Sequence, residues 1–287
     1  MTAPTRTLAL APEEARRLAR LALDEDLAGG VDVTTLATVP ADLTGVARIV
    51  ARADGVVAGL PIAAAVFAQR LGSFEGVRTA TADGARVRAG QLLLEVTGPT
   101  QELLTAERSA LNLLTHLSGV ATLTARWVEA VAGTGVVVRD TRKTMPGLRA
   151  AEKYAVRCGG GANHRMGLHD QALIKDNHVV AAGGVAAAIR AVRAAYPPVF
   201  CEVECDTLDQ VAEAVREGAV VVLLDNMGPD DLRAAVALCA PHGVRTEASG
   251  GLTLESAPAV AATGVDYLAV GALTHSAPAL DIALDLT

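Results

Sequence analysis

Positively charged side chains are concentrated in one stretch of the sequence, residues 139–175. Of the 25 basic residues in the chain, 22 are Arg, and the three Lys all lie in this stretch. The stretch holds eight basic and three acidic side chains, whereas the whole chain has a net charge of −7. A salt-bridged helix face would need carboxylates three or four residues from each cation, and there are too few. The cluster therefore predicts a site for a small polyanionic ligand rather than for a charged polymer.

Four of these cations are the main candidates for the anion site: Arg142, Lys143, Arg165 and Lys175. Lys143 and Lys175 lie at or just beyond the ends of predicted strands, where a compact ammonium group can be oriented toward a ligand. The remaining arginines of the stretch are weaker candidates: Arg139, Arg149 and Arg157. Lys153 falls on a predicted helix and is expected to be a solvated or ion-paired side chain.

Two acidic side chains close predicted strands farther along the chain. Glu204 ends the run FCEVEC, and Asp225 ends VVVLLD. A carboxylate at such a position can bind Mg²⁺, accept hydrogen bonds from ribose hydroxyls or stabilise a cationic transition state. Glu202 shares a strand face with Glu204 because side chains alternate with period two, and one of the two could be purely structural.

Glycine-containing loops follow the last two predicted strands, with the sequences ASGG (248–251) and AVGA (269–272). In barrels of alternating strands and helices, this pair of loops commonly binds a phosphate through backbone N–H groups. Glycine permits the close approach of the ligand to the backbone. Ordinary turns also contain Gly-Gly, so one such loop is weak evidence for a phosphate site. Two glycine-containing loops after consecutive strands are stronger evidence for it.

The spacing of hydrophobic residues differs between two regions of the chain. Residues 12–27 and 61–72 read as helices, and residues 43–96 otherwise read as short strands, which favours a small α/β domain with a mostly antiparallel sheet. A helical pattern covers residues 102–131. Strands then alternate with helices, and the six predicted strands are 136–141, 172–178, 200–205, 220–225, 245–251 and 266–271.

The second region is predicted to form a parallel sheet covered by helices. Nearly every strand ends in charged or glycine-rich sequence, which is how a βα-barrel builds its active site. A doubly wound sheet would gather such residues at one switch point, and the chain has no GxGxxG motif. Six strands are fewer than the eight of a closed barrel. We therefore expect an open or incomplete barrel of about six to seven strands.

Composition excludes several classes of protein. With 287 residues, 51% apolar and 20% charged, the chain is long enough for one or two globular domains. The acidic balance and 2% aromatic content argue against nucleic acid and anionic membranes as partners. The four cysteines show no metal-binding spacing, and no signal peptide or membrane-spanning run is evident. A cytoplasmic protein is expected.

The sequence resembles the quinolinate phosphoribosyltransferase (decarboxylating) family from about residue 20 to the end. The segments that carry the resemblance are RDTRKTMPGLRAAEKYAVRCGGGANHRMGLHD, IKDNH, EVECDT, LLDNM, EASGGLT and YLAVGALTHSAPALDIALD. The resemblance implies an N-terminal α/β sandwich, residues 1–115, and an open βα-barrel, residues 116–275. The tail 276–287 is expected to pack on the sandwich. It also implies a homodimer with shared active sites.

The family's reaction joins quinolinate to 5-phosphoribosyl 1-pyrophosphate with Mg²⁺, giving nicotinate mononucleotide, pyrophosphate and CO₂. By resemblance, the residues that contact quinolinate are Arg142, His164, Arg165 and Lys175, with Thr141 also at the substrate site. Arg108 is expected to reach the site from the neighbouring subunit.

The same resemblance implies the residues that act on the sugar and its phosphates. Lys143 is expected near the pyrophosphate and ribose, and Glu204 and Asp225 are expected to hold ribose hydroxyls and Mg²⁺. The residues expected to cradle the 5-phosphate are Ser249, Gly250, Gly251, Val270, Gly271 and Ala272.

The sequence is also compatible with three other functions. A relative specific for nicotinate would need fewer cations than the chain offers. A Schiff-base aldolase or lyase on the same barrel could use Lys175 as its amine. A binding protein without turnover is disfavoured by the presence of both Glu204 and Asp225.

Overall fold

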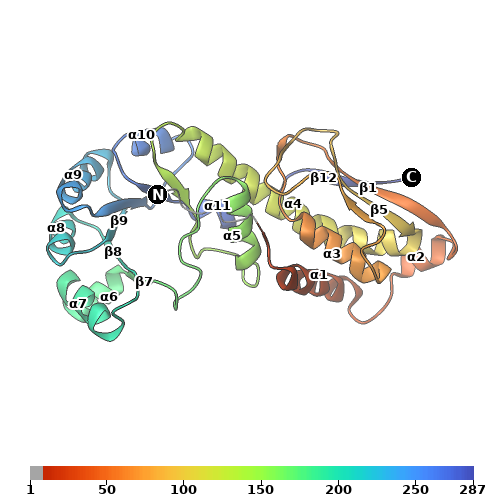
Figure 1. Cartoon of the computed structure of the whole chain (residues 1–287), viewed down its shortest axis with the longest axis horizontal. Helices are drawn as coiled ribbons and strands as arrows, with labels where there is room; N and C mark the ends of the chain where they lie inside the picture. The colour runs from red at the N-terminus through yellow and green to blue at the C-terminus, as the bar shows by residue number, and fades with distance from the viewer. Residues whose placement is uncertain (1–8) are drawn as a thin grey trace. The chain divides into compact units, whose positions relative to one another are not determined.

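The computed structural model describes residues 9–287, which form two compact units (Figure 1). The first unit joins the chain up to Ala125 with Met145–Gly160 and Ser276–Thr287. The second joins Arg126–Thr144 with Gly161–His275. The boundary predicted at residue 115 falls inside the continuous helix α4 (Thr100–Ala130). Because this segment contains no proline and keeps the helical spacing of its apolar residues, nothing interrupts the helix there.

The first unit is built on an antiparallel sheet with the strand order β12-β1-β5-β3. The strands are β1 (Thr44–Ala51), β3 (Val77–Thr79), β5 (Leu92–Pro99) and β12 (Ile282–Leu286). Along β1, Ala47 and Ile49 are buried, whereas Arg48 is exposed and pairs with Glu95 across the sheet at 3.0 Å. One face of the sheet therefore covers the core. A separate ladder pairs β2 (Gly55–Val56) with β4 (Arg86–Val87).

Helices complete the first unit: α1 (Pro12–Leu27), α2 (Val33–Thr38), α3 (Leu60–Leu71), α5 (Arg149–Cys158) and most of α4. Helix α3 packs against α1 and the sheet, and most of its side chains are buried. Asp83 caps the start of α3 by accepting the N–H groups of Gly59 and Leu60 at 2.9 and 3.1 Å, and it also accepts the Tyr154 hydroxyl at 2.8 Å. This carboxylate thus links three segments that lie far apart in the sequence.

The second unit is built on a parallel sheet with the strand order β6-β11-β10-β9-β8-β7. The strands are β6 (Val137–Arg139), β7 (Ala172–Ile174), β8 (Cys201–Cys205), β9 (Val221–Asp225), β10 (Arg245–Ser249) and β11 (Tyr267–Ala269). Strands β6 and β7 lie at opposite ends of this order, so the sheet stays open within residues 9–287. The predicted fold class, an α/β sandwich followed by an open barrel, is confirmed.

Helices connect successive strands of this sheet from β7 onward: α6 (Asp176–Ala182), α7 (Val185–Ala195), α8 (Leu208–Arg216), α9 (Pro229–Cys239) and α10 (Ala257–Ala261), with a 3₁₀ turn η1 (Ala240–His242). Helix α11 (Ala272–His275) follows the last of these strands, β11. Figure 1 shows α8 and α9 beside β8 and β9. The predicted strand 172–178 is wrong in its second half, because α6 begins at Asp176. The N–H of Lys175 donates to Nδ1 of His178 at 3.0 Å, which stabilises the first turn of that helix.

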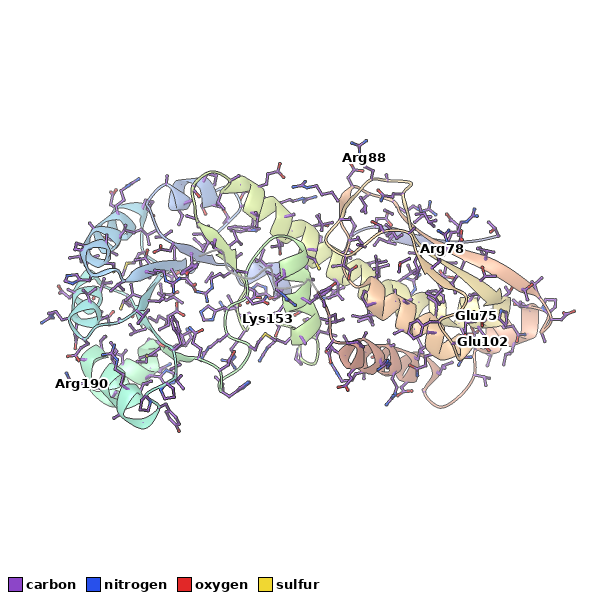
Figure 2. The ribbon with its side chains drawn as sticks, viewed as in Figure 1. Glu75, Arg78, Arg88, Glu102, Lys153 and Arg190 are labelled. Carbon is purple, nitrogen blue, oxygen red and sulfur yellow. The ribbon has the colours of Figure 1, made fainter. Side chains whose placement is uncertain are left out.

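The cores of both units are packed mainly from Ala, Val and Leu, as the low aromatic content requires. Lys153 on α5 is an exception, since its side chain is 1% exposed and therefore buried rather than solvated (Figure 2). No single helix within residues 9–287 has the length and apolar composition to cross a membrane, although α6 and α7, bent by 88° at their junction, meet those two criteria when counted together.

The C-terminal tail packs closely against α4 in the first unit. The N–H of Leu280 donates to the carbonyl oxygen of Thr115 at 3.0 Å. A Cβ atom added to Gly119 would lie only 2.1 Å from the carbonyl oxygen of Pro278. Glycine is therefore required at this position of the helix so that the tail can approach the backbone.

The substitution Gly119→Ala tests this contact, because helix propensity should raise the free energy of unfolding and a clash with the tail should lower it. In an exposed helix interior, alanine would stabilise the protein by about 1 kcal/mol. Here the clash with backbone should dominate and lower the free energy of unfolding by about 1–3 kcal/mol. Urea unfolding followed by circular dichroism measures the difference, and a gain in stability would show that the tail does not pack on α4.

Candidate active site

A cavity of about 420 Å³ opens at the carboxyl ends of the parallel strands in the second unit. All six strands, or the segments that connect them, contribute to its lining, which consists of Thr141, Arg142, Lys143, His164, Arg165, Leu173, Lys175, Glu204, Leu223, Asp225, Glu247, Ser249 and Ala269. On β9 and β10 the lining residues are two apart, since alternate side chains of a strand face the same side.

The four principal cations of the sequence prediction all line this cavity. Lys175 forms an ion pair with Glu204. The carbonyl oxygen of Lys143 accepts the hydroxyl of Thr274 at 2.8 Å, and the Lys143 side chain passes over Gly271, where an added Cβ would lie 2.9 Å from Cδ. Burial and then the positive charge of Arg142 lower the pKa of Arg165 from its usual value, although a guanidinium remains charged at neutral pH.

Asp140 explains why two distant motifs meet at the cavity. It is fully buried and accepts the Asn163 side-chain amide at 2.5 Å and the N–H of His164 at 2.9 Å. Arg139 also forms a parallel bridge with Ala162. These contacts fix the segment that carries Arg142 and Lys143 beside the segment that carries His164 and Arg165.

The two predicted acids, Glu204 and Asp225, lie on the cavity wall. Oδ2 of Asp225 accepts the side-chain amide of Asn226 at 2.6 Å, and Asp225 is paired in register with Ser249 on the adjacent strand. Glu202 differs from both, because it is fully buried below Glu204 and does not line the cavity.

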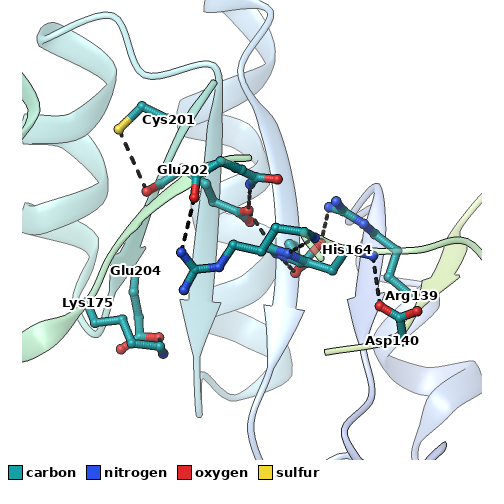
Figure 3. A network of polar contacts seen from close by, with 10 residues as sticks. Arg139, Asp140, His164, Lys175, Cys201, Glu202 and Glu204 are labelled. Carbon is teal, nitrogen blue, oxygen red and sulfur yellow. Dashed lines mark hydrogen bonds and ion pairs between the residues drawn. The ribbon is translucent and has the colours of Figure 1, made fainter. Parts of the chain in front are cut away.

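His164 lies at the floor of the cavity between two buried glutamates (Figure 3). Its Nε2 is 3.0 Å from Glu202 and 3.4 Å from Glu247. Burial disfavours a charged ring, but hydrogen bonds and charges of Glu202 and Glu247 outweigh it and raise the pKa of His164 to about 8. The N–H of Arg165 donates to Nδ1 at 2.7 Å, a contact that only the neutral ring can accept. Glu202 and Glu247 therefore favour the doubly protonated imidazole of His164, whereas the N–H of Arg165 favours the form without a proton on Nδ1.

Glu247 is a lining residue that the sequence analysis did not select. Arg139 forms an ion pair with it, so Arg139 neutralises a buried carboxylate instead of facing a ligand. The signal for Glu247 was present in the sequence: it lies two residues before Ser249 on the same strand, and alternate residues share a face. The lining residues Leu173, Leu223 and Ala269 were also not selected, since nothing separates them from ordinary core residues in the sequence.

The predicted phosphate loops contribute to the cavity unequally. Ser249 lines it, whereas Gly250, Gly251, Val270, Gly271 and Ala272 are not among its lining residues. Val270 is buried and its N–H donates to the carbonyl oxygen of Arg139 at 2.9 Å. Gly250, with φ of 86°, contacts Asn226 closely, because a Cβ there would lie 2.2 Å from the Asn226 side-chain oxygen.

The remaining candidates lie in the first unit. Arg108 is an exposed residue of α4, and its role across a subunit interface stays a prediction. Arg149 and Arg157 lie on α5, where the Arg157 guanidinium sits 5.7 Å from the centre of the Tyr154 ring. These two arginines belong to a different unit from the cavity that the four principal cations line.

A larger hollow of about 580 Å³ in the first unit does not suit a polyanion. Its charged lining residues are Glu75 and Arg78, both labelled in Figure 2, and Glu95. Arg78 is ion-paired with Glu95 at 2.8 Å. The cavity at the strand ends, with Arg142, Lys143, Arg165 and Lys175 and three acidic side chains at its wall, is therefore the candidate active site.

An open parallel barrel with cations, paired acids and a glycine-containing loop at its strand ends defines an enzyme of small phosphorylated or carboxylated substrates. Comparison with known proteins identifies the family. Residues 32–118 match the N-terminal domain of quinolinate phosphoribosyl transferase, and residues 120–285 match its C-terminal domain. The chain belongs to the quinolinate phosphoribosyltransferase family, which confirms the resemblance seen in the sequence.

Individual relatives agree with this assignment. A nicotinate-nucleotide pyrophosphorylase [carboxylating] of Mycobacterium leprae is 53% identical over 96% of this chain and 98% of its own length. A probable nicotinate-nucleotide pyrophosphorylase of Bacillus subtilis is 45% identical over 84% of this chain and 83% of its own. The crystal structure of NadC from Streptococcus pyogenes matches with a TM-score of 0.92 at 39% identity, covering 97% of this chain and 98% of that one.

The close approach of Lys143 to Gly271 gives a prediction about the cavity. In Gly271→Ala, the new methyl group should displace the flexible Lys143 side chain and weaken the binding of inorganic pyrophosphate by about tenfold, the effect of one charge-assisted contact. Gly228→Ala is the control, since nothing lies within 4 Å of an added Cβ there. Isothermal titration calorimetry measures both affinities. Equal affinities in the two variants would contradict the placement of Lys143 over Gly271.

Proposed function

We propose that the chain transfers the phosphoribosyl group of 5-phosphoribosyl 1-pyrophosphate to quinolinate with loss of CO₂. The products are nicotinate mononucleotide, pyrophosphate and CO₂. The observation that carries the proposal is the cavity in which Arg142, Lys143, Arg165 and Lys175 face Glu204 and Asp225. Its cations suit a substrate with two carboxylates and one with several phosphates, and its acids suit the sugar between them.

Quinolinate would bind at the side of the cavity where arginines gather. Guanidinium groups match carboxylates in charge and geometry, so Arg142 and Arg165 would grip the two carboxylates. Lys175 and His164 would complete this part of the site, with Thr141 at its edge. Lys175 would exchange its ion pair with Glu204 for a contact with substrate, leaving Glu204 available to the ribose.

The phosphoribosyl substrate would lie against Lys143, Glu204 and Asp225. Both acids are oxygen donors at the cavity wall, the ligand type that Mg²⁺ prefers. Bound Mg²⁺ would neutralise charge on the pyrophosphate. The carboxylates would also hold ribose hydroxyls and stabilise positive charge at the anomeric carbon. The 5-phosphate would bind at the loops of Ser249 to Gly251 and Val270 to Ala272.

Reaction in this cavity needs orientation and charge stabilisation rather than a nucleophilic side chain. The ring nitrogen of quinolinate forms a bond to the anomeric carbon as the bond to pyrophosphate breaks. The bond between the ring and the adjacent carboxylate then breaks and releases CO₂. Its electron pair stays on the ring carbon beside the cationic nitrogen until a proton from water replaces the carboxylate.

The direct test mixes the protein with quinolinate, 5-phosphoribosyl 1-pyrophosphate and Mg²⁺. We expect release of CO₂, formation of nicotinate mononucleotide and loss of both on chelation of Mg²⁺. Arg165→Lys keeps the charge but loses the paired donors, and it should lower kcat/KM for quinolinate by about 10- to 100-fold. Turnover of nicotinate in place of quinolinate, or trapping of a carbonyl substrate on Lys175 by borohydride, would contradict the proposal.

Shared active sites are part of the same proposal, with Arg108 entering from the neighbouring subunit of a homodimer. Arg108→Ala and Lys143→Ala should each be nearly inactive. If Arg108 acts across the interface, mixing the two variants should restore up to about a quarter of wild-type activity by random exchange of subunits. Mixtures that stay inactive after proven subunit exchange would place both residues in one chain's site.

A cytoplasmic location also stays a prediction, since some relatives from Nicotiana are named mitochondrial.

A further inference from the structure

Glu202 is a buried carboxylate for which the proposed reaction has no direct use. Its side chain is fully buried on β8, two residues before Glu204. Burying a carboxylate is costly unless hydrogen bonds or opposite charges compensate it. Oε2 of Glu202 accepts the side-chain amide of Gln171 at 2.8 Å and lies 3.0 Å from Nε2 of His164. Gln171 and His164, the two partners of Glu202, both also contact Arg165.

Arg165 is held at its backbone and at its side chain. Its N–H donates to Nδ1 of His164, and one terminal guanidinium nitrogen donates to the carbonyl oxygen of Gln171 at 3.1 Å. Since His164 and Gln171 both contact Glu202, the four residues form a closed ring of polar contacts. The ring joins β8 to the segment between β6 and β7, which carries Arg165 into the cavity.

The position of the imidazole proton of His164 decides which nitrogen donates within this ring of four residues. Because Nδ1 accepts the N–H of Arg165, the imidazole proton is on Nε2, which faces Glu202. An imidazolium would also carry a hydrogen on Nε2, so the contact between Nε2 and Glu202 is present in the neutral and in the charged form. Arg165 itself is only 9% exposed and has five N–H donors, of which the contact with Gln171 uses one.

A metal ion is a weaker explanation for the same cluster. His164, Glu202 and Glu247 bring possible ligand atoms within 4.8 Å of one another. However, Glu202 already accepts the amide of Gln171, and Glu247 is already neutralised by Arg139. Both contacts use Oε2, and Oε1 of each carboxylate has no hydrogen-bond partner among the described residues. A metal ion on Nε2 of His164 would instead require the imidazole proton on Nδ1, where it would oppose the N–H of Arg165 at 2.7 Å.

We propose that Glu202 is a positioning residue that holds the Arg165 guanidinium, through Gln171 and His164, in the orientation that grips one carboxylate of quinolinate. Glu202 does not touch the substrate or the metal, and Glu204 alone of the two faces the ligands. The inference rests on the proposed function in one respect, that Arg165 contacts a carboxylate of quinolinate. Its consequence is that Glu202 controls affinity for quinolinate and not for the phosphoribosyl substrate.

The test is a double-mutant cycle measured by calorimetric binding of quinolinate. Glu202→Gln keeps the shape of the side chain but removes its charge, and it should weaken quinolinate binding by about tenfold, as expected for a charged hydrogen bond. Binding of 5-phosphoribosyl 1-pyrophosphate should change less than about twofold. In an Arg165→Lys background, the effect of Glu202→Gln should fall well below tenfold, because the Arg165 guanidinium is lost and only the contact of Glu202 with His164 still reaches the ligand.

Arg142→Lys is the matched control for the cycle. Arg142 is also a cavity arginine but lies outside the ring, so Glu202→Gln should retain its full effect in that background. If Glu202→Gln does not fold, Gln171→Leu removes the same link from the other side and should give the same pattern. Equal effects in the Arg165→Lys and Arg142→Lys backgrounds, or equal losses for both substrates, would overturn the inference. Failure of the wild-type chain to bind quinolinate would instead overturn the proposed function, and this inference with it.

Discussion

The candidate active site depends on holding several cations close together against their mutual repulsion. Two unit charges 4 Å apart repel by about 4 kcal/mol at the effective dielectric constant of a protein surface. Burial lowers the pKa of Arg165 most, and the positive charge of Arg142 lowers it further, as this repulsion requires. Two buried carboxylates offset it: Glu202, which does not line the cavity, and Glu247, which lines its wall.

The parallel sheet makes this arrangement possible. Its strands end at one edge, so residues far apart in the sequence meet there, and the segment between α5 and β7 adds His164 and Arg165. Asp140 then fixes two of these segments to each other through the amide of Asn163 and the N–H of His164. Because the supporting contacts are buried and involve charged groups, the loss of a single partner is costly.

The sequence was sufficient to predict the fold class, the family and most of the charged residues that line the cavity, because charge at strand ends is a local signal. It was not sufficient to predict what lies beneath them. Glu202 and Glu204 are equivalent by period, and only the depth of β8 in the sheet separates a buried support from a cavity residue. Likewise, the inclusion of Met145–Gly160 in the first unit depends on long-range packing, and the early start of α6 depends on one hydrogen bond to His178. Arg108 stays a prediction for the same reason, since a subunit interface is not encoded in any local pattern.

A crystal structure of the protein with bound quinolinate tests the central claim most directly. The account predicts both carboxylates of the ligand within hydrogen-bond distance of Arg142, Arg165 and Lys175, with the ring nitrogen directed toward Glu204 and Asp225. Quinolinate bound elsewhere, or bound in this cavity with its carboxylates turned away from all three cations, would contradict it.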